Sequence, residues 1–224
     1  MKYPRIAHVP FSSVYDPTDL IRRTRSAIFG MEWVVTEKLD GSQVNIQFVD
    51  GMIEVWNRNT DVLHGGADRQ FNMIHQWLQS RHEALWNLLG DDRIVFGDWM
   101  FHVHTLKYTR LPDVFVSYDI YNKPSGAFVP FDDAMTEIEK AGLFHVPVIA
   151  KVVLRDEAHL LSFVSTSAYS DCEMEGLVLH SADGKDRVKY VTPGFKVAID
   201  ARGAHWRECD RTRNVIAGCE ARPA

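Results

Sequence analysis

The feature that most constrains the fold is an alternation of apolar and polar residues with a period of two, which indicates β-strands rather than a helical protein. The runs MEWVVTEKL (31–39) and SQVNIQFVDGMIEVWN (42–57) place β-branched and aromatic residues in alternation. Asp50 and Gly51, inside the second run, are typical of a tight hairpin turn. Further strand-like runs cover residues 93–101, 113–121, 146–154, 174–180 and 186–191.

Helical spacing appears between these strands. In residues 67–90 apolar residues recur near the helical period, and Asp68 and Gly90 are expected to mark the start and the end of the helix. Residues 131–143 predict a second helix, a short helix is expected from Asp156, and the tail from residue 193 should begin as a helix. This order of elements favours one α+β domain with antiparallel sheets.

Composition limits the classes of function. The chain has 224 residues, a formal charge of −5 and 46% hydrophobic residues, so it is not a bulk polyanion binder, although a basic groove can lie on an acidic body. No apolar run approaches membrane-spanning length and the N-terminus lacks the apolar core of a signal peptide. We therefore expect a cytoplasmic protein with no membrane partner. Cys172, Cys209 and Cys219 are interpreted as reduced thiols.

Lys38 lies in the segment TEKLDGSQVNI, between two strand-like runs. Taken alone, this segment favours a surface hairpin with solvated charges. A lysine amine becomes a nucleophile when burial or nearby cations lower its pKa. Arg187 and Lys189, two apart on one strand face, are candidate cations, and a phosphate between them would offset their repulsion. Gly41 permits a sharp turn close to a ligand.

Six segments, in order along the chain, resemble motifs of the covalent nucleotidyltransferases, the superfamily of polynucleotide ligases and mRNA capping enzymes. EKLDGS is similar to motif I, whose lysine becomes linked to AMP or GMP, and Lys38 holds that position. EVWNRNT resembles the next motif, whose arginine meets a nucleic acid end or phosphate, and Arg58 matches. VFGDW resembles motif III, whose acid binds the ribose hydroxyls; Asp98 stands where glutamate is usual.

The other three segments lie further along. VSYDIY resembles the segment whose aromatic residue stacks on the base, which implies that role for Tyr118. EGLVLH is similar to motif IV, so Glu175 would help to hold the metal, largely through water, and to organise the lysine site. DRVKYV resembles motif V, which implies that Lys189 contacts the α-phosphate, with Arg187 where lysine is more usual.

The resemblance covers roughly residues 1–195 and implies an ATP-grasp-like nucleotidyltransferase domain of antiparallel sheets flanked by helices. Residues 196–224 are expected to form a short, partly helical extension. About thirty residues follow motif V, too few for a typical OB-fold domain, so none is expected. Gln43 stands where DNA ligases and capping enzymes typically carry arginine, and KYPRI and GDWMFHVHTLKYTRLPDVFVSYDIY also resemble RNA-ligase sequences. An RNA ligase is therefore the favoured branch.

An RNA ligase of this kind would work in three steps with ATP. Lys38 attacks the α-phosphorus and releases pyrophosphate, AMP passes to an RNA 5′-phosphate, and an RNA 3′-hydroxyl displaces AMP to seal the strand. Mg²⁺ or Mn²⁺ is expected because the triphosphate carries more charge than a few side chains balance. Asp40 is expected to orient Lys38 or to accept a metal-bound water, and Glu37 to contact the adenine amino group.

Several alternatives stay open. They are a DNA ligase, a capping-type guanylyltransferase and a non-catalytic nucleotide- or RNA-binding module, the last motivated by Asp98 and Arg187. His102 and His104 lie two apart, and structural histidines are favoured over a zinc site. The arginines after residue 201 either form a solvated face or contact RNA. The sequence leaves open the RNA geometry, the oligomeric state and whether an end-healing kinase or phosphatase is a partner.

Overall fold

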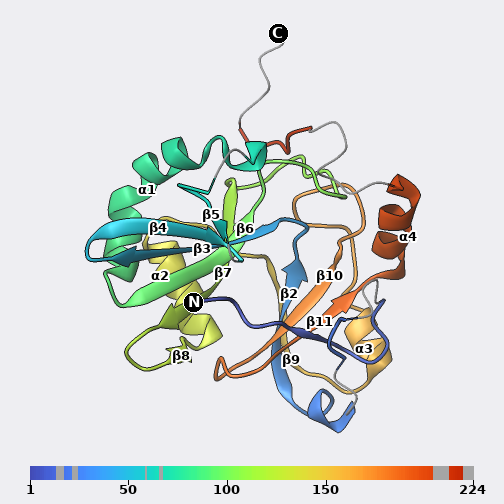
Figure 1. The fold of residues 1–224 in the computed structure, drawn as a ribbon. Coiled ribbons are helices and arrows are strands. Elements are labelled where there is room, and N and C mark those ends of the chain that lie inside the picture. Colours follow the sequence, from blue (N-terminus) through green and yellow to red (C-terminus); the bar gives the residue numbers. More distant parts are fainter. Residues whose placement is uncertain (14–17, 22–24, 59, 66–67, 204–211, 219–224) are drawn as a thin grey trace.

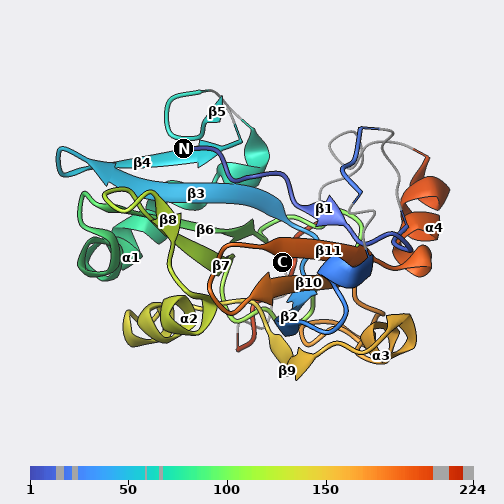
Figure 2. The same ribbon diagram turned by 90° about the horizontal axis from the view of Figure 1, so that it is seen from below.

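Two β-sheets lie next to each other at the centre of the protein (Figure 1). The computed structural model describes residues 1–13, 18–21, 25–58, 60–65, 68–203 and 212–218. Helices α1 (Ile74–Leu89) and α2 (Phe131–Lys140) lie beside one sheet, and α3 (Glu157–Leu161) lies beside the other (Figures 1 and 2). The α+β class expected from the sequence is therefore confirmed.

The first sheet has five strands in the order β1-β11-β10-β2-β9. Their bounds are β1 Ala7–His8, β11 Arg187–Val191, β10 Gly176–Ser181, β2 Glu32–Lys38 and β9 Val148–Val153. The pairs that join β11, β10, β2 and β9 are antiparallel, whereas β1 runs parallel to β11. The expectation of purely antiparallel sheets is thus wrong for this edge strand, whose two residues are too short to show a pattern in the sequence.

The second sheet has six strands in the order β5-β4-β3-β6-β7-β8. Their bounds are β5 Thr60–Asp61, β4 Met52–Asn57, β3 Ser42–Val49, β6 Arg93–Trp99, β7 Phe115–Asn122 and β8 Ala127–Phe128. Asp50 and Gly51 have φ of 52° and 75°, the left-handed conformation that a tight hairpin between β3 and β4 needs. The predicted hairpin is confirmed.

Each sheet packs on its own core. Val44, Ile46 and Phe48 on one face of β3 share a cluster with buried residues of α1 and α2. Trp33 and Leu177 belong to the cluster of the first sheet, together with residues beside α3. Because strand residues alternate between faces, the opposite face of β3 and the face of β2 that carries Lys38 are left to line a space between the sheets.

Helix boundaries differ from the expectation at one end. Asp68 caps a short 3₁₀ turn (Arg69–Phe71) by accepting a hydrogen bond from the Gln70 amide, and α1 begins only at Ile74. Gly90 ends α1 with φ of 47°, as expected. Helix α4 (Pro193–Arg202) is capped by the Thr192 hydroxyl and runs across the expected boundary at residue 195. A second 3₁₀ turn covers Arg25–Ala27.

The segment that carries Lys38 is a crossover between the sheets and not a hairpin. Strand β2 ends at Lys38 in the first sheet, and β3 begins at Ser42 in the second. A period of two is the same in both arrangements, so the sequence could not separate them. At Gly41 an added Cβ would lie 2.4 Å from the Met100 sulfur and 2.8 Å from the Asp98 Cβ, so only glycine fits.

The C-terminal part that the structure describes packs on the loop after β6. The amide of Val103 donates to the carbonyl of Thr212 (3.0 Å), and the Asn214 side-chain amide donates to the carbonyl of Met100 (2.8 Å). Cys172 is an exposed free thiol, while Cys209, Cys219 and the arginines of 22–23 and 207–211 lie outside the described residues. Among the helices of the described ranges, none is both long and apolar enough to cross a bilayer.

Candidate active site

A pocket of about 980 Å³ lies between the two sheets. Both sheets, helix α4 and the N-terminal residues contribute to its lining. From β2 and the crossover come Thr36, Glu37, Lys38, Leu39, Asp40 and Gly41; from the second sheet and its loops Gln43, Arg58, Asp98, His104, Thr105 and Tyr118; from the rest Val146, Glu175, Val178, His180, Lys189, Phe195, Ile199 and Arg202. Its size suits a nucleotide.

Lys38 and Glu175 form an ion pair on the wall of this pocket. The Lys38 Nζ lies 2.7 Å from Oε1 of Glu175, and the lysine side chain is 22% exposed. Strand pairing explains the contact, because Lys38 is opposite Gly176 in the β2–β10 ladder and Glu175 precedes that glycine. A reagent in the pocket can therefore reach the amine while the carboxylate fixes its direction.

Three carboxylates share this part of the pocket. Burial raises the pKa of Glu175 to about 8; the Lys38 ammonium opposes this rise, and Asp40 and Asp98 add to it. Burial likewise raises the pKa of Asp98 to about 7, against the effect of Lys38. The acids are thus close enough to repel one another, and the site favours positive charge beside them.

The backbone after β6 holds Asp40 in place. Its Oδ2 accepts hydrogen bonds from the amides of Thr105 (2.6 Å) and Leu106 (2.8 Å). The Asp40 amide donates to the Tyr108 hydroxyl (2.8 Å). These hydrogen bonds fix the crossover at Asp40, two residues after Lys38, which limits how far the lysine amine can move.

Glu37 points away from Lys38, as neighbours on a strand must. Its two carboxylate oxygens accept hydrogen bonds from the Ser167 hydroxyl and from the Ala168 amide, the latter at 2.9 Å. Burial raises its pKa, and these hydrogen bonds lower it. The expected contact with adenine stays a prediction, and in this structure the carboxylate is engaged by the loop at 167–168.

Tyr118 owes its direction to a bulge. Between Phe96 and Gly97 the partners on β7 jump from Asp119 to Ser117, so Tyr118 is the extra residue. Opposite it, a Cβ on Gly97 would lie 2.6 Å from the Phe115 ring, so the glycine allows the strands to come this close. Alternation along a strand does not by itself show which face is buried, and in the structure Tyr118 lines the pocket.

Of the two expected cations on β11, the structure places only Lys189 on the pocket. Burial lowers the pKa of Lys189, and the nearby Lys38 ammonium lowers it further. Arg187 is instead in a buried ion pair with Asp119, with its Nε 2.7 Å from Oδ2, and its guanidinium lies over the Phe128 ring at 4.0 Å. Its expected phosphate contact stays a prediction, and in this structure the guanidinium donates to both carboxylate oxygens of Asp119.

Other expected residues of the second sheet do face the pocket. Arg58 lies just after β4 with φ of 49° and is exposed. His104 is buried, and its Nε2 lies 3.4 Å from the Ser42 hydroxyl, consistent with a structural histidine that also lines the pocket. His102 lies outside the pocket lining, and its Nδ1 pairs with the carbonyl of Thr212 at 3.2 Å.

Two walls were missed in the sequence. Residues 2–6, the KYPRI segment that resembles RNA-ligase sequences but was given no role in the site, line the pocket together with Thr18 and Asp19. On α4, Phe195, Ile199 and Arg202 line it too, and the Arg202 Nη1 donates to the carbonyl of His104. The spacing of these three α4 residues, 195, 199 and 202, is that of one helix face and was the available signal.

The comparisons with known proteins agree with this geometry. The family model described as RNA ligase matches residues 31–191. The chain belongs to the RNA ligase family. Among curated proteins no match to this RNA ligase family member was found.

Solved structures similar to this family member include RNA ligases of Naegleria gruberi. The RNA ligase with PPi has a TM-score of 0.65 and 19% identity over 90% of this chain and 64% of that chain. A point mutant with ATP and Mn has a TM-score of 0.63 and 18% identity over 89% and 63%. A mutant with AMP and Mn has a TM-score of 0.60 and 20% identity over 76% and 52%. These show a shared fold, and this chain spans between half and two thirds of those chains.

The residues present fit a divalent cation that is held partly by protein carboxylates and partly by the phosphate oxygens of a bound nucleotide. Among the described residues, Oε2 of Glu175 is buried without a hydrogen-bond partner, and Asp40 and Asp98 add negative charge beside it. No group of three or more His, Cys, Asp or Glu within the described ranges could hold a metal by itself. Mg²⁺ is commonly bound in this way, by one or two carboxylates with water and phosphate oxygens.

The raised pKa of Asp98 predicts how stability depends on pH. The folded protein keeps a proton between the ordinary pKa of 3.8 and about 7, so stability from this group is present at low pH and lost as pH rises through about 7. Asp98→Asn removes the effect. Between pH about 4 and 8 the free energy of unfolding of the wild type should fall more than that of the variant. The expected difference between the two decreases is on the order of 1–3 kcal/mol.

Urea unfolding of both proteins at several pH values measures this difference. Asp92→Asn, at an exposed position outside the pocket, is the matched control. Parallel curves for wild type and Asp98→Asn would show that Asp98 keeps an ordinary pKa.

Proposed function

We propose that this protein is an ATP-dependent RNA ligase that becomes adenylylated on Lys38, transfers the AMP to an RNA 5′-phosphate and seals that end to a 3′-hydroxyl. The observation that carries the proposal is the 2.7 Å pair between Lys38 and Glu175 in a nucleotide-sized pocket between the two sheets. Membership of the RNA ligase family and the fold shared with an RNA ligase that was solved with ATP and Mn support it.

In the first step the Lys38 amine forms a bond to the α-phosphorus, and the bond from that phosphorus to the bridging oxygen breaks. Pyrophosphate leaves with the electron pair. The amine must first lose a proton, and Glu175 is the acceptor within reach. Because the pKa of Glu175 is raised, its carboxylate is a stronger base than an ordinary one, so proton transfer from the Lys38 ammonium to Glu175 costs less free energy. A bound divalent cation would supply charge neutralisation for the phosphates.

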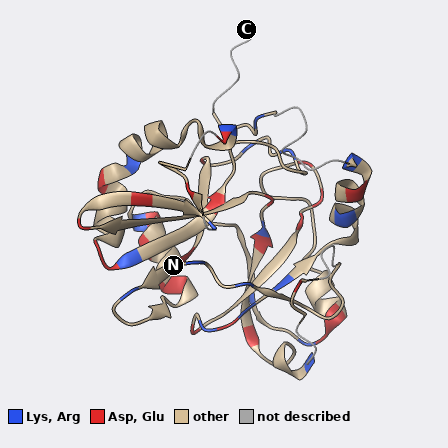
Figure 3. Ribbon diagram, in the orientation of Figure 1, with Lys and Arg blue, Asp and Glu red and all other residues tan. Residues whose placement is uncertain are grey.

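The remaining pocket residues take the following roles. Lys189 contacts the α-phosphate, Asp98 the ribose hydroxyls and Tyr118 the adenine ring, as their places on the lining allow. Arg58 lies on the edge of the second sheet and contacts the RNA end. Acidic and basic positions are interspersed along the ribbon (Figure 3), so RNA would be recognised by a local groove rather than by a basic face. We further propose that the domain is of the ATP-grasp-like nucleotidyltransferase type and that its location is cytoplasmic.

Covalent labelling tests the proposal. The protein is incubated with magnesium and α-labelled ATP or GTP, and the labelled residue is located by mass analysis. Label from ATP on Lys38 is expected. Label from GTP alone would indicate a capping-type transferase, and no label with any divalent ion would indicate a non-catalytic module. Nicked duplexes with RNA or DNA on each side of the break then separate an RNA ligase from a DNA ligase.

Arg58→Ala should separate the steps. We expect enzyme–AMP formation to stay within about twofold, while sealing of pre-adenylated RNA falls roughly 10- to 100-fold, because a charged hydrogen bond to phosphate is lost. Gel assays of both reactions on one protein preparation measure the split. Arg155→Ala, at an exposed position outside the pocket, is the control. Equal loss of both activities would place Arg58 in the nucleotide site instead.

A further inference from the structure

Residues 2–6, called here the N-terminal segment, run along the pocket and are anchored at both ends. At one end, the Tyr3 hydroxyl donates to the Asp119 carboxylate, and the Tyr3 ring packs edge-on against Tyr118 with centroids 5.1 Å apart. At the other end the segment leads into β1, where His8 pairs in register with Lys189 of β11. The segment is thus held between the base-side wall of the pocket and the strand that carries Lys189.

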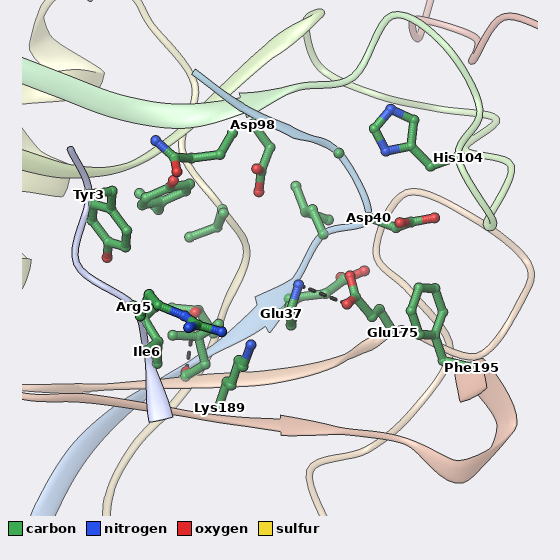
Figure 4. Close-up of a pocket in the computed structure, with 18 of the residues that line it drawn as sticks. Tyr3, Arg5, Ile6, Glu37, Asp40, Asp98, His104, Glu175, Lys189 and Phe195 are labelled. Carbon is green, nitrogen blue, oxygen red and sulfur yellow. Dashed lines mark hydrogen bonds and ion pairs between the residues drawn. The ribbon is translucent and has the colours of Figure 1, made fainter. Parts of the chain in front are cut away.

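Arg5 lies between these anchors. Its Nη2 donates to the carbonyl (3.0 Å) and the hydroxyl (3.3 Å) of Thr18, and lies 4.0 Å from Oδ1 of Asp19. The side chain is 61% exposed and lines the pocket. In Figure 4 the side chains of Arg5 and Lys189 extend toward the same part of the pocket.

Three cations therefore meet in this part of the pocket. Burial and the positive charge of Lys38 lower the pKa of Lys189, the carboxylates of Asp19 and Glu175 raise it, and Arg5 lowers it by a smaller amount, so these charges lie close together. Glu175 pairs with Lys38 and Asp19 lies 4.0 Å from Arg5, so part of this positive charge is already offset, and an anion bound between the three cations would offset the rest. Two lysines would balance the charge of a single phosphate. The Arg5 guanidinium adds a third cation, with two parallel N–H donors, which indicates an anion with more than one phosphoryl group.

The first step of the proposed reaction produces such an anion. As the bond from the α-phosphorus to the bridging oxygen breaks, negative charge builds on the departing pyrophosphate, and a cation placed there lowers the barrier. Lys38 and Lys189 are assigned to the α-phosphate, so they leave this charge to other groups. Arg58 follows β4, a strand of the other sheet.

We propose that Arg5, held over the pocket by Tyr3 and β1, binds the β- and γ-phosphates of the nucleotide and stabilises the departing pyrophosphate. This inference rests on the proposed function, since it needs a triphosphate in the pocket. It assigns a residue outside the segment matched by the family model, residues 31–191, to the chemistry of the first step alone.

The test compares Arg5→Ala with Arg25→Ala. The two arginines are a matched pair, because Arg25 is also 61% exposed and also faces an acid, with its Nη2 3.4 Å from Oε2 of Glu157, but lies outside the pocket lining. Three reactions are measured: enzyme–AMP formation from ATP, discharge of purified enzyme–AMP by inorganic pyrophosphate with magnesium, and sealing of pre-adenylated RNA.

For Arg5→Ala we expect the first two reactions to slow roughly 10- to 100-fold and the third to stay within about twofold. Arg5→Lys should recover part of the loss, because it keeps the charge without the fork; it also serves if the alanine variant melts at a lower temperature. Arg25→Ala should match wild type in all three reactions.

Two results would overturn the inference. Unchanged pyrophosphate discharge in Arg5→Ala would remove Arg5 from the leaving-group site, and an equal loss in sealing would place it on RNA or in general pocket structure. Neither outcome affects the proposed function as long as wild type forms enzyme–AMP. Conversely, a wild type that takes no label removes both.

Discussion

Replacing Lys38 by alanine should abolish the covalent nucleotide adduct and leave the protein folded. The amine is the nucleophile of the proposed first step, and no other described group occupies its place beside Glu175, so enzyme–AMP formation should fall at least about 10³-fold. The side chain is partly exposed at a strand end and contributes little to either core. Labelling with α-labelled ATP, with a thermal melt of the same sample, measures both effects.

Two variants control this result. Lys38→Arg keeps a cation beside Glu175 but has no nucleophilic amine, so it should also take no label. Lys196→Ala removes a lysine that is 37% exposed on α4 and pairs with Asp200 at 3.4 Å, and it should label normally. Persistent label in Lys38→Ala would mean that another residue is the nucleophile.

Glu175→Gln should lower the rate of the first step by about 10²- to 10⁴-fold with little change in shape. Glutamine occupies the same volume but neither accepts the lysine proton nor carries charge for a cation. Since burial raises the pKa of Glu175 to about 8, the wild-type kcat/KM for ATP should rise with pH up to about that value and then level off. In Glu175→Gln this rise should disappear.

A stopped assay of enzyme–AMP formation between pH about 6 and 9 records this profile. Glu173→Gln, an exposed glutamate two residues earlier, is the matched control and should keep the wild-type profile. If Glu175→Gln retains the pH dependence, the titrating group lies elsewhere, with Asp98 the next candidate.

Sequence patterns predicted the parts of the fold that depend on local periodicity. The hairpin at Asp50 and the end of α1 at Gly90 follow from residue types at single positions. The sheet crossover after Lys38 does not, because alternation records which face a side chain takes and not which sheet the strand joins. Spacing placed Arg187 and Lys189 on one strand face, but only the tertiary structure reveals the Asp119 carboxylate that engages Arg187.

The candidate site divides in the same way. Motif resemblance identified Lys38, Asp98, Tyr118, Glu175 and Lys189, all of which line one pocket. It included Arg5 within KYPRI but gave neither Arg5 nor Asp19 a place in the site, because segments without regular structure carry no period that shows which way a side chain points. Nor could it show that the carboxylate of Glu37 is engaged by the loop at 167–168, a contact between residues far apart in the chain.

Asn214 has a practical consequence for where this protein can be cut. Its side chain accepts from the Tyr108 amide (2.8 Å) and donates to the carbonyls of Met100 (2.8 Å) and His102 (3.1 Å), while the Tyr108 hydroxyl accepts from the Asp40 amide. A shortened chain that ends after α4 would retain every motif yet lose the hydrogen bonds of Asn214, which hold the loop that supports the crossover. The smallest working unit is therefore set by long-range hydrogen bonds, and on the C-terminal side it extends beyond the last motif to Asn214.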